Sequence, residues 1–130
     1  MKKLIWIVLA AFIIFLFTPM AVSMFQGQIT QHAKAKWAPM AQYQLGNLCF
    51  WTIRYGPALQ CYNLLLDRYP GHPRKRATSM FRVAICHERL RQYEAAIRAY
   101  ERLVAAYPNN KNAGHAEGQL KKLREVHGIE

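Results

Sequence analysis

Two stretches of the sequence repeat each other 38 residues apart, and they decide the fold. The first is Tyr55-Gly-Pro-Ala-Leu-Gln-Cys-Tyr-Asn-Leu-Leu-Leu-Asp-Arg-Tyr-Pro70, and the second is Tyr93-Glu-Ala-Ala-Ile-Arg-Ala-Tyr-Glu-Arg-Leu-Val-Ala-Ala-Tyr-Pro108. Tyrosine, alanine, an aliphatic residue, a second tyrosine, two aliphatic residues and a closing Tyr-Pro recur in the same order. Such an internal repeat is typical of a solenoid, in which each unit buries its apolar face against its neighbours.

Within each copy, apolar residues recur at helical spacing, which predicts two amphipathic helices joined by a tight turn. In the second copy the two apolar faces consist of Met80, Val83, Ala84 and His87, and of Ala96, Ile97, Tyr100, Leu103, Val104 and Tyr107. The first copy repeats this pattern with Leu45, Cys49, Ala58, Leu59, Tyr62, Leu65 and Leu66. Pro70 and Pro108 end the second helices, because proline disfavours the helical conformation in the preceding residue. The sequence therefore predicts an all-α fold.

Small residues stand where the two helix axes of each hairpin must approach closely. They are Gly46 and Ala58 in the first copy and Ala84 and Ala96 in the second. A larger side chain at these positions would push the helices apart.

Taken together, these residues resemble the tetratricopeptide repeat (TPR). The matching positions in the first copy are Tyr43 or Trp37, Leu45-Gly46-Asn47, Ala58, Tyr62 and Pro70. Those in the second copy are Val83-Ala84, Tyr93, Ala96-Ile97, Tyr100 and Pro108. The ending Leu-Leu-x-x-Tyr-Pro is similar to repeats of bacterial envelope proteins of the outer-membrane-assembly type. The resemblance implies an α-solenoid that binds protein partners and carries no catalytic site.

We predict a transmembrane helix followed by two TPR helix hairpins and a C-terminal capping helix. The corresponding segments are a transmembrane anchor or signal sequence over 1–25, a linker over 26–38 and a TPR-like domain over 39–126. Within that domain we expect repeat one over 39–70, repeat two over 74–108 and the capping helix over 112–126. Two repeats are fewer than the three or so that a solenoid usually needs. Further packing is therefore expected from a partner subunit, a second copy or the chain's own Ile29–Trp37 segment.

The N-terminal segment allows two interpretations. As a signal peptide, Lys2 and Lys3 precede an apolar stretch, and Ala21-Val22-Ser23 supplies a small-residue cleavage site. As an anchor, an uninterrupted helix over Leu4–Phe25 would be about 33 Å long at 1.5 Å per residue, which matches a hydrocarbon core of roughly 30 Å. Pro19 decides between them, because a helix broken there is too short to span. We favour the retained anchor, since membrane helices tolerate proline.

The flanking charges predict the orientation of this segment. Lys2 and Lys3 favour a cytoplasmic N-terminus, which places the TPR domain in the periplasm of a bacterium as a single-pass inner-membrane protein. Lys34 and Lys36 oppose this orientation, because they place positive charge at the other end of the segment.

The charge balance is strongly basic. The chain has 18 Lys and Arg residues against 7 Asp and Glu residues, a net charge of +11. This balance favours anionic partners such as acidic protein surfaces, lipid headgroups or nucleic acid. The densest basic cluster, Arg74-Lys75-Arg76, is a candidate anion contact, and a solvated loop before a helix is the alternative.

The family resemblance also implies a partner-binding groove lined by the first helix of each hairpin. Transferred residue by residue, this groove consists of Tyr43, Asn47, Phe50, Phe81, Ile85 and Arg89. These side chains suit an extended or helical peptide with acidic flanks. Ordinary packing between helices is the alternative explanation for the aromatic residues.

Catalytic, metal and cofactor sites are not expected. The three cysteines, Cys49, Cys61 and Cys86, lie in apolar helical stretches without a ligand or redox spacing, which indicates buried thiols. A Cys49–Cys61 disulfide is the alternative in an exported domain. Cys86 and His87 are adjacent on a helix and so point to different faces.

We therefore expect a non-enzymatic interaction module, an accessory or assembly subunit of a bacterial inner-membrane or envelope complex. Its expected partners are other subunits of that complex, the membrane and a second copy of the chain. One alternative is a soluble periplasmic binder of an anionic ligand, released by cleavage after Ser23. Another is a basic, cytoplasm-facing binder of lipid or nucleic acid, although nucleic acid is not a partner under the first hypothesis.

Overall fold

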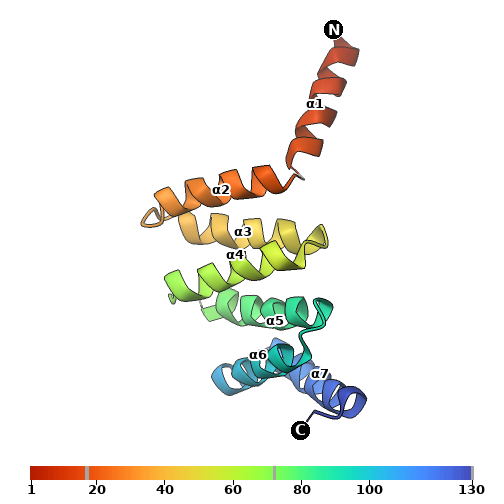
Figure 1. Cartoon of the computed structure of the whole chain (residues 1–130). Helices are drawn as coiled ribbons and strands as arrows, with labels where there is room; N and C mark the ends of the chain where they lie inside the picture. The colour runs from red at the N-terminus through yellow and green to blue at the C-terminus, as the bar shows by residue number, and fades with distance from the viewer. Residues whose placement is uncertain (17, 72, 130) are drawn as a thin grey trace.

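Helices follow one another along the chain as successive layers of a single stack (Figure 1). The computed structural model describes residues 1–16, 18–71 and 73–129, and the side chains of residues 73 and 74 lie outside this description. The helices are α1 (Lys2–Leu16), α2 (Pro19–Gln31), α3 (Ala38–Trp51), α4 (Tyr55–Arg68), α5 (Pro73–Arg89), α6 (Tyr93–Ala106) and α7 (Lys111–His127). The described residues contain no strand. The all-α prediction is confirmed, and the helices form an α-solenoid.

The two predicted hairpins are α3 with α4 and α5 with α6, and α7 packs against α6 at the end of the stack. Close helix approach in the first hairpin depends on Gly46. A β-carbon at that position would lie 2.8 Å from Cε1 of Tyr62, so only glycine lets the buried ring reach α3. Ala58, Ala84 and Ala96 are fully buried, as their positions in the repeat predict.

The buried residues form two core clusters on either side of α5. The first joins α2, α3, α4 and α5 and includes Val22, Ile29, Leu45, Cys49, Ala58, Cys61, Tyr62, Val83 and Cys86. The second joins α5, α6 and α7 and includes Ala77, Ala84, Ala96, Ile97, Tyr100, Leu103, Ala116, Leu120 and Leu123. Both faces of α5 are therefore covered, one by the first cluster and the other by the second. This explains how an array of only two repeats can bury its apolar residues.

The N-terminal segment differs from the expected straight span. α1 ends at Leu16, and α2 begins at Pro19 after a bend of 72°. Among the described residues no single helix is both long and apolar enough to cross a membrane, whereas α1 and α2 meet that criterion together, as a bent pair. The Thr18 hydroxyl bonds to both helices: it donates to the Phe15 carbonyl of α1 at 2.7 Å and accepts from the Ala21 amide of α2 at 3.2 Å.

The segment predicted as a linker over 26–38 is helical as far as Gln31. It forms the C-terminal half of α2, which packs against α3. The side-chain amides of Gln26 and Gln42 bond to each other reciprocally at 3.0 and 2.9 Å, and Gln42 also donates to the Cys61 carbonyl at 3.1 Å. Ile29 is buried on the same side. α2 thus forms an additional layer at the N-terminal end of the stack.

Both hairpin turns contain a residue in the left-handed conformation. Ile53 has φ 63° between α3 and α4, and Arg91, at the equivalent position between α5 and α6, has φ 59°. The amide of the next residue then bonds back to the first helix of its hairpin, from Arg54 to the Cys49 carbonyl and from Gln92 to the His87 carbonyl, each at 2.8 Å. This geometry turns the chain sharply without a glycine.

Candidate functional site

Arg82 of α5 reaches across to α3 and stands among four aromatic rings. Its guanidinium carbon lies 5.4 Å from the ring centroid of Phe50, 5.8 Å from those of Tyr43 and Trp51, and 6.0 Å from that of Tyr62. A guanidinium within about 6 Å of an aromatic centroid is attracted by the ring quadrupole. We call these five residues, together with Asn47, the Arg82 cluster.

Hydrogen bonds fix the polar centre of the Arg82 cluster. The Tyr62 hydroxyl donates to Oδ1 of Asn47 at 2.8 Å, and Nη1 of Arg82 donates to the same oxygen and, at 3.1 Å, to the Tyr62 hydroxyl. Burial raises the pKa of Tyr62, so its hydroxyl keeps its proton and acts as a neutral donor. One amide oxygen therefore aligns α3, α4 and α5.

The charge on Arg82 has only neutral partners among the described residues. The ion pairs found among the described residues join Arg98 to Glu94 and Arg124 to Glu101, and neither involves Arg82. Because no carboxylate among the described residues pairs with it, this guanidinium can still bind a carboxylate of another molecule.

The Arg82 cluster reaches the surface at its edges. Trp51 is 71% exposed and Met40 is 44% exposed. Nζ of Lys75 lies 5.9 Å from the Tyr43 ring centroid and 3.4 Å from the Met40 sulfur, so a second cation borders the same aromatic surface. The result is a partly exposed aromatic surface with two positive charges and no acidic neighbour among the described residues.

The structure divides the six residues of the predicted groove between three places. Tyr43, Asn47 and Phe50 come together in the Arg82 cluster. Phe81 and Ile85 pack against the second core cluster instead, where the Phe81 ring centroid lies 5.9 Å from that of Tyr100. The family resemblance places Phe81 and Ile85 in an open groove, whereas in this chain α7 packs against that side of α5.

Arg89 lies apart from the other five predicted groove residues. It is exposed at the end of α5 and lines a shallow cavity of about 330 Å³ with Tyr93 and Lys122. The structure therefore does not bring it to the Arg82 cluster.

The predicted basic loop is also divided. Lys75 borders the Arg82 cluster, whereas Arg76 donates through Nη1 to the Leu66 carbonyl at 2.7 Å and so satisfies the end of α4. The side chain of Arg74 lies outside the described residues. Lys75 and Arg76 belong to the first turns of α5 and not to a loop, and of these two cations only Lys75 borders the candidate site.

Sequence reasoning did not single out Arg82 and Trp51. A signal for Arg82 was present, because it is the only Lys, Arg, Asp or Glu residue between Arg76 and Glu88 in the sequence. A lone arginine in a helix that is covered on both faces needs a specific environment. No comparable local signal distinguishes Trp51 from a core aromatic residue.

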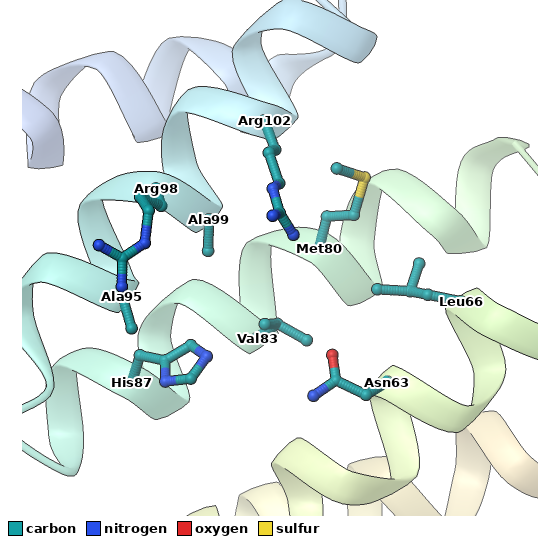
Figure 2. A pocket seen from close by; sticks show the side chains of 9 residues that line it. All are labelled: Asn63, Leu66, Met80, Val83, His87, Ala95, Arg98, Ala99 and Arg102. Carbon is teal, nitrogen blue, oxygen red and sulfur yellow. The ribbon is translucent and has the colours of Figure 1, made fainter.

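A second hollow lies between α4, α5 and α6 and has a volume of about 250 Å³ (Figure 2). Val83 forms its floor, while His87 and Arg102 reach toward it from α5 and α6 (Figure 2). Nδ1 of His87 is engaged by Oε1 of Gln92 at 2.7 Å. This hollow is smaller than typical ligand sites of about 300 to 1,000 Å³.

The three cysteines are free and buried, as their apolar surroundings predict. Burial raises the pKa of Cys86 to about 12, so its thiol stays protonated at neutral pH. The Cys61 thiol donates a hydrogen bond to the Cys49 sulfur. This bond is the largest cause of two opposite shifts: it lowers the pKa of Cys49 and raises the pKa of Cys61. Within the described residues, no three His, Cys, Asp or Glu side chains are grouped so as to hold a metal ion.

Comparison with known proteins agrees with this architecture. The family model described as tetratricopeptide repeat matches residues 37–109, which is more than half of the chain. No curated protein matches the sequence. The match spans α3 to α6, the two hairpins that carry the Arg82 cluster. The chain therefore belongs to the tetratricopeptide repeat family, a non-catalytic repeat fold whose members generally mediate protein–protein interactions.

Proposed function

We propose that this protein is a membrane-anchored adaptor that binds an acidic segment of a partner protein at the Arg82 cluster. The observation that carries the proposal is the environment of Arg82: a guanidinium positioned by four aromatic rings and without a carboxylate partner among the described residues. Arginine and exposed aromatic residues are the types enriched at binding hot spots. An acidic side chain or C-terminal carboxylate of the partner would pair with Arg82 while its apolar residues cover Trp51.

The anchor in this proposal is α1, at the inner membrane of a bacterium, with a cytoplasmic N-terminus and a periplasmic TPR stack. All residues of α1 after Lys3 are apolar, and none of the helix is buried against the stack. At 1.5 Å per residue the helix is about 22 Å long, somewhat short of the roughly 30 Å hydrocarbon core. The break before Pro19 leaves α1 alone shorter than a standard span, so the proposal requires that Lys2 and Lys3 extend to the headgroups and that the bilayer thins around the short helix.

Retention of α1 is supported by the packing of α2. Cleavage after Ser23 would remove Ala21 and Val22, which are 0% and 9% exposed. It would also remove Thr18, whose hydroxyl caps α2. A signal peptide is expected to leave the mature core intact, so these buried residues favour an uncleaved chain. The intact mass of the protein recovered from membranes tests this directly, because a mass that lacks residues 1–23 contradicts the anchor.

Partner binding is tested by photocrosslinking in cells that express the full chain. A photoreactive benzoylphenylalanine at position 51 should form one discrete adduct with an acidic partner segment. Arg82→Gln should reduce the adduct yield at least tenfold, because a charge-assisted hydrogen bond of about 1.5 to 3 kcal/mol is lost.

The matched control is Arg98→Gln. Arg98 is an exposed arginine of α6 that lies outside the Arg82 cluster, and its side chain is 64% exposed. This variant should leave the adduct yield unchanged. Far-ultraviolet circular dichroism must show equal helicity for both variants. Equal adduct yields from folded Arg82→Gln and wild-type protein would contradict the proposed site.

A further inference from the structure

The two ends of the helix stack have surfaces of different chemistry. α7, at the C-terminal end, exposes charged side chains: Lys111, Glu117, Lys121, Lys122, Arg124 and Glu125. α2, at the N-terminal end, contains no charged residue at all. Terminal helices of a solenoid normally have a polar outer face because that face meets water. The exposed residues of α2 include the polar Ser23, Gln28, Thr30 and Gln31, but none of them carries a charge, and Met20 and Met24 stand among them.

The uncharged outer face of α2 is well defined. Met20, Met24 and Gly27 are exposed and follow helical spacing on the side opposite the buried Ala21, Val22 and Ile29. Met20 is 73% exposed and Met24 is 51% exposed. The N-terminal member of this face, Met20, follows the last residue of α1, Leu16, by four residues in the sequence.

The bend determines how this face lies relative to α1. With α1 along the bilayer normal, the 72° bend places α2 about 18° from the membrane plane, since 18° is the complement of that angle. Among the described residues beside the bend, the Thr18 amide donates to the Phe15 carbonyl at 2.9 Å and the Val22 amide donates to the Thr18 carbonyl at 3.3 Å. Internal satisfaction of this kind is what a backbone requires near the hydrocarbon region.

We infer that α2 lies on the bilayer surface with Met20, Met24 and Gly27 against the lipid interface, while its other face forms the first layer of the TPR stack. This inference rests on the proposed anchoring by α1. Lys34 and Lys36, both exposed in the turn after α2, supply positive charge for anionic headgroups.

The consequence is a fixed orientation of the whole stack. The reciprocal Gln26–Gln42 amide pair and buried Ile29 join α2 to α3, so the stack follows the orientation of α2. Successive layers then lead away from the membrane, with α1 at one end and α7 at the other (Figure 1). The Arg82 cluster, which joins α3, α4 and α5, then lies outside the lipid surface, and α7 is the layer farthest from the membrane.

The test places an environment-sensitive NBD fluorophore on single cysteines in the full chain. The variants are Met24→Cys on α2, Ile14→Cys on α1 and Glu117→Cys on α7, and all three positions are exposed. The native cysteines are 0% to 3% exposed, so we expect them not to react in the folded protein, and labelling of the wild-type chain checks this. The proteins are reconstituted into phosphatidylcholine–phosphatidylglycerol vesicles that contain lipids with a doxyl quencher either near the headgroup or deep in the acyl chain.

Met24→Cys should be quenched several times more strongly than Glu117→Cys, and most by the shallow quencher. Ile14→Cys should be quenched most by the deep one. Quenching at position 14 together with a water-exposed label at position 24 would overturn the inference about α2 and leave the anchor in place. A label at position 14 that escapes both quenchers would overturn the anchoring itself. Gly27→Cys, where no atom lies within 4 Å of an added β-carbon, provides a second probe of the same face.

Discussion

Gly46 offers the sharpest test of how the first hairpin is packed. In Gly46→Ala, the new β-carbon would lie 2.8, 3.0 and 3.2 Å from three ring atoms of Tyr62, whereas ordinary contacts are 3.4 to 4 Å. The ring cannot tilt away freely, because it is fully buried and its hydroxyl bonds to Asn47 and Arg82. Either the helices separate or the hydrogen bonds of the Arg82 cluster break.

The magnitude follows from three contributions. Overpacking in a dense core costs about 1 to 3 kcal/mol, and weakened hydrogen bonds of Tyr62 add about 1 kcal/mol. The higher helix propensity of alanine offsets about 1 kcal/mol. We expect a net loss of about 1 to 3 kcal/mol in unfolding free energy, or about 4 to 12 °C in melting temperature at roughly 4 °C per kcal/mol for a domain of this size.

The assay is thermal unfolding of the full chain in mild detergent, followed by far-ultraviolet circular dichroism. Gly118→Ala in α7 is the matched control, since no atom lies within 4 Å of its added β-carbon, and it should raise stability by up to about 1 kcal/mol. In a double-mutant cycle, Tyr62→Leu should cost less in the Gly46→Ala background than in wild type. A Gly46→Ala protein as stable as wild type, or strictly additive effects, would refute the packing argument.

Four further predictions concern single residues and use the same unfolding measurement. Asn47→Ala should cost about 1 to 3 kcal/mol, because Tyr62 loses its buried hydrogen-bond acceptor. Ser79→Ala should be neutral or stabilising by about 1 kcal/mol, since the buried hydroxyl has no partner among the described residues; a large loss of stability would contradict this prediction. Ile53→Asn should raise stability by up to about 1 kcal/mol, because asparagine tolerates the positive φ that a β-branched residue resists. Finally, stability should fall as the pH rises above about 9, because burial raises the pKa of Cys86 from 9.0 to about 12 and only the unfolded thiol ionises in that range; Cys86→Ala should make this decline shallower, and an unchanged slope would contradict the assignment.

Much of the fold could be predicted from local sequence. The recurrence of tyrosine, alanine and Tyr-Pro, the spacing of apolar residues and the prolines after α4 and α6 all act within one helix or one turn. Helical periodicity and proline sterics do not depend on distant parts of the chain. For the same reason helical spacing places Tyr43, Asn47 and Phe50 on one face of α3, where the structure has them together beside Arg82.

Tertiary structure decided the rest. Whether Phe81 faces a partner or the interior depends on α7, which follows α5 and α6 in the chain. No local sequence pattern specifies where α7 packs. The convergence of Arg82 on the aromatic residues of α3 joins positions more than 30 residues apart, such as Asn47 and Arg82. The N-terminus shows the same limit. Its composition predicts an apolar helix and Pro19 predicts a break, but the Gln26–Gln42 pair and the burial of Ile29 are what place α2 in the stack. Periodicity along one helix identifies its apolar face, and only the packing of helices distant in sequence determines what covers that face.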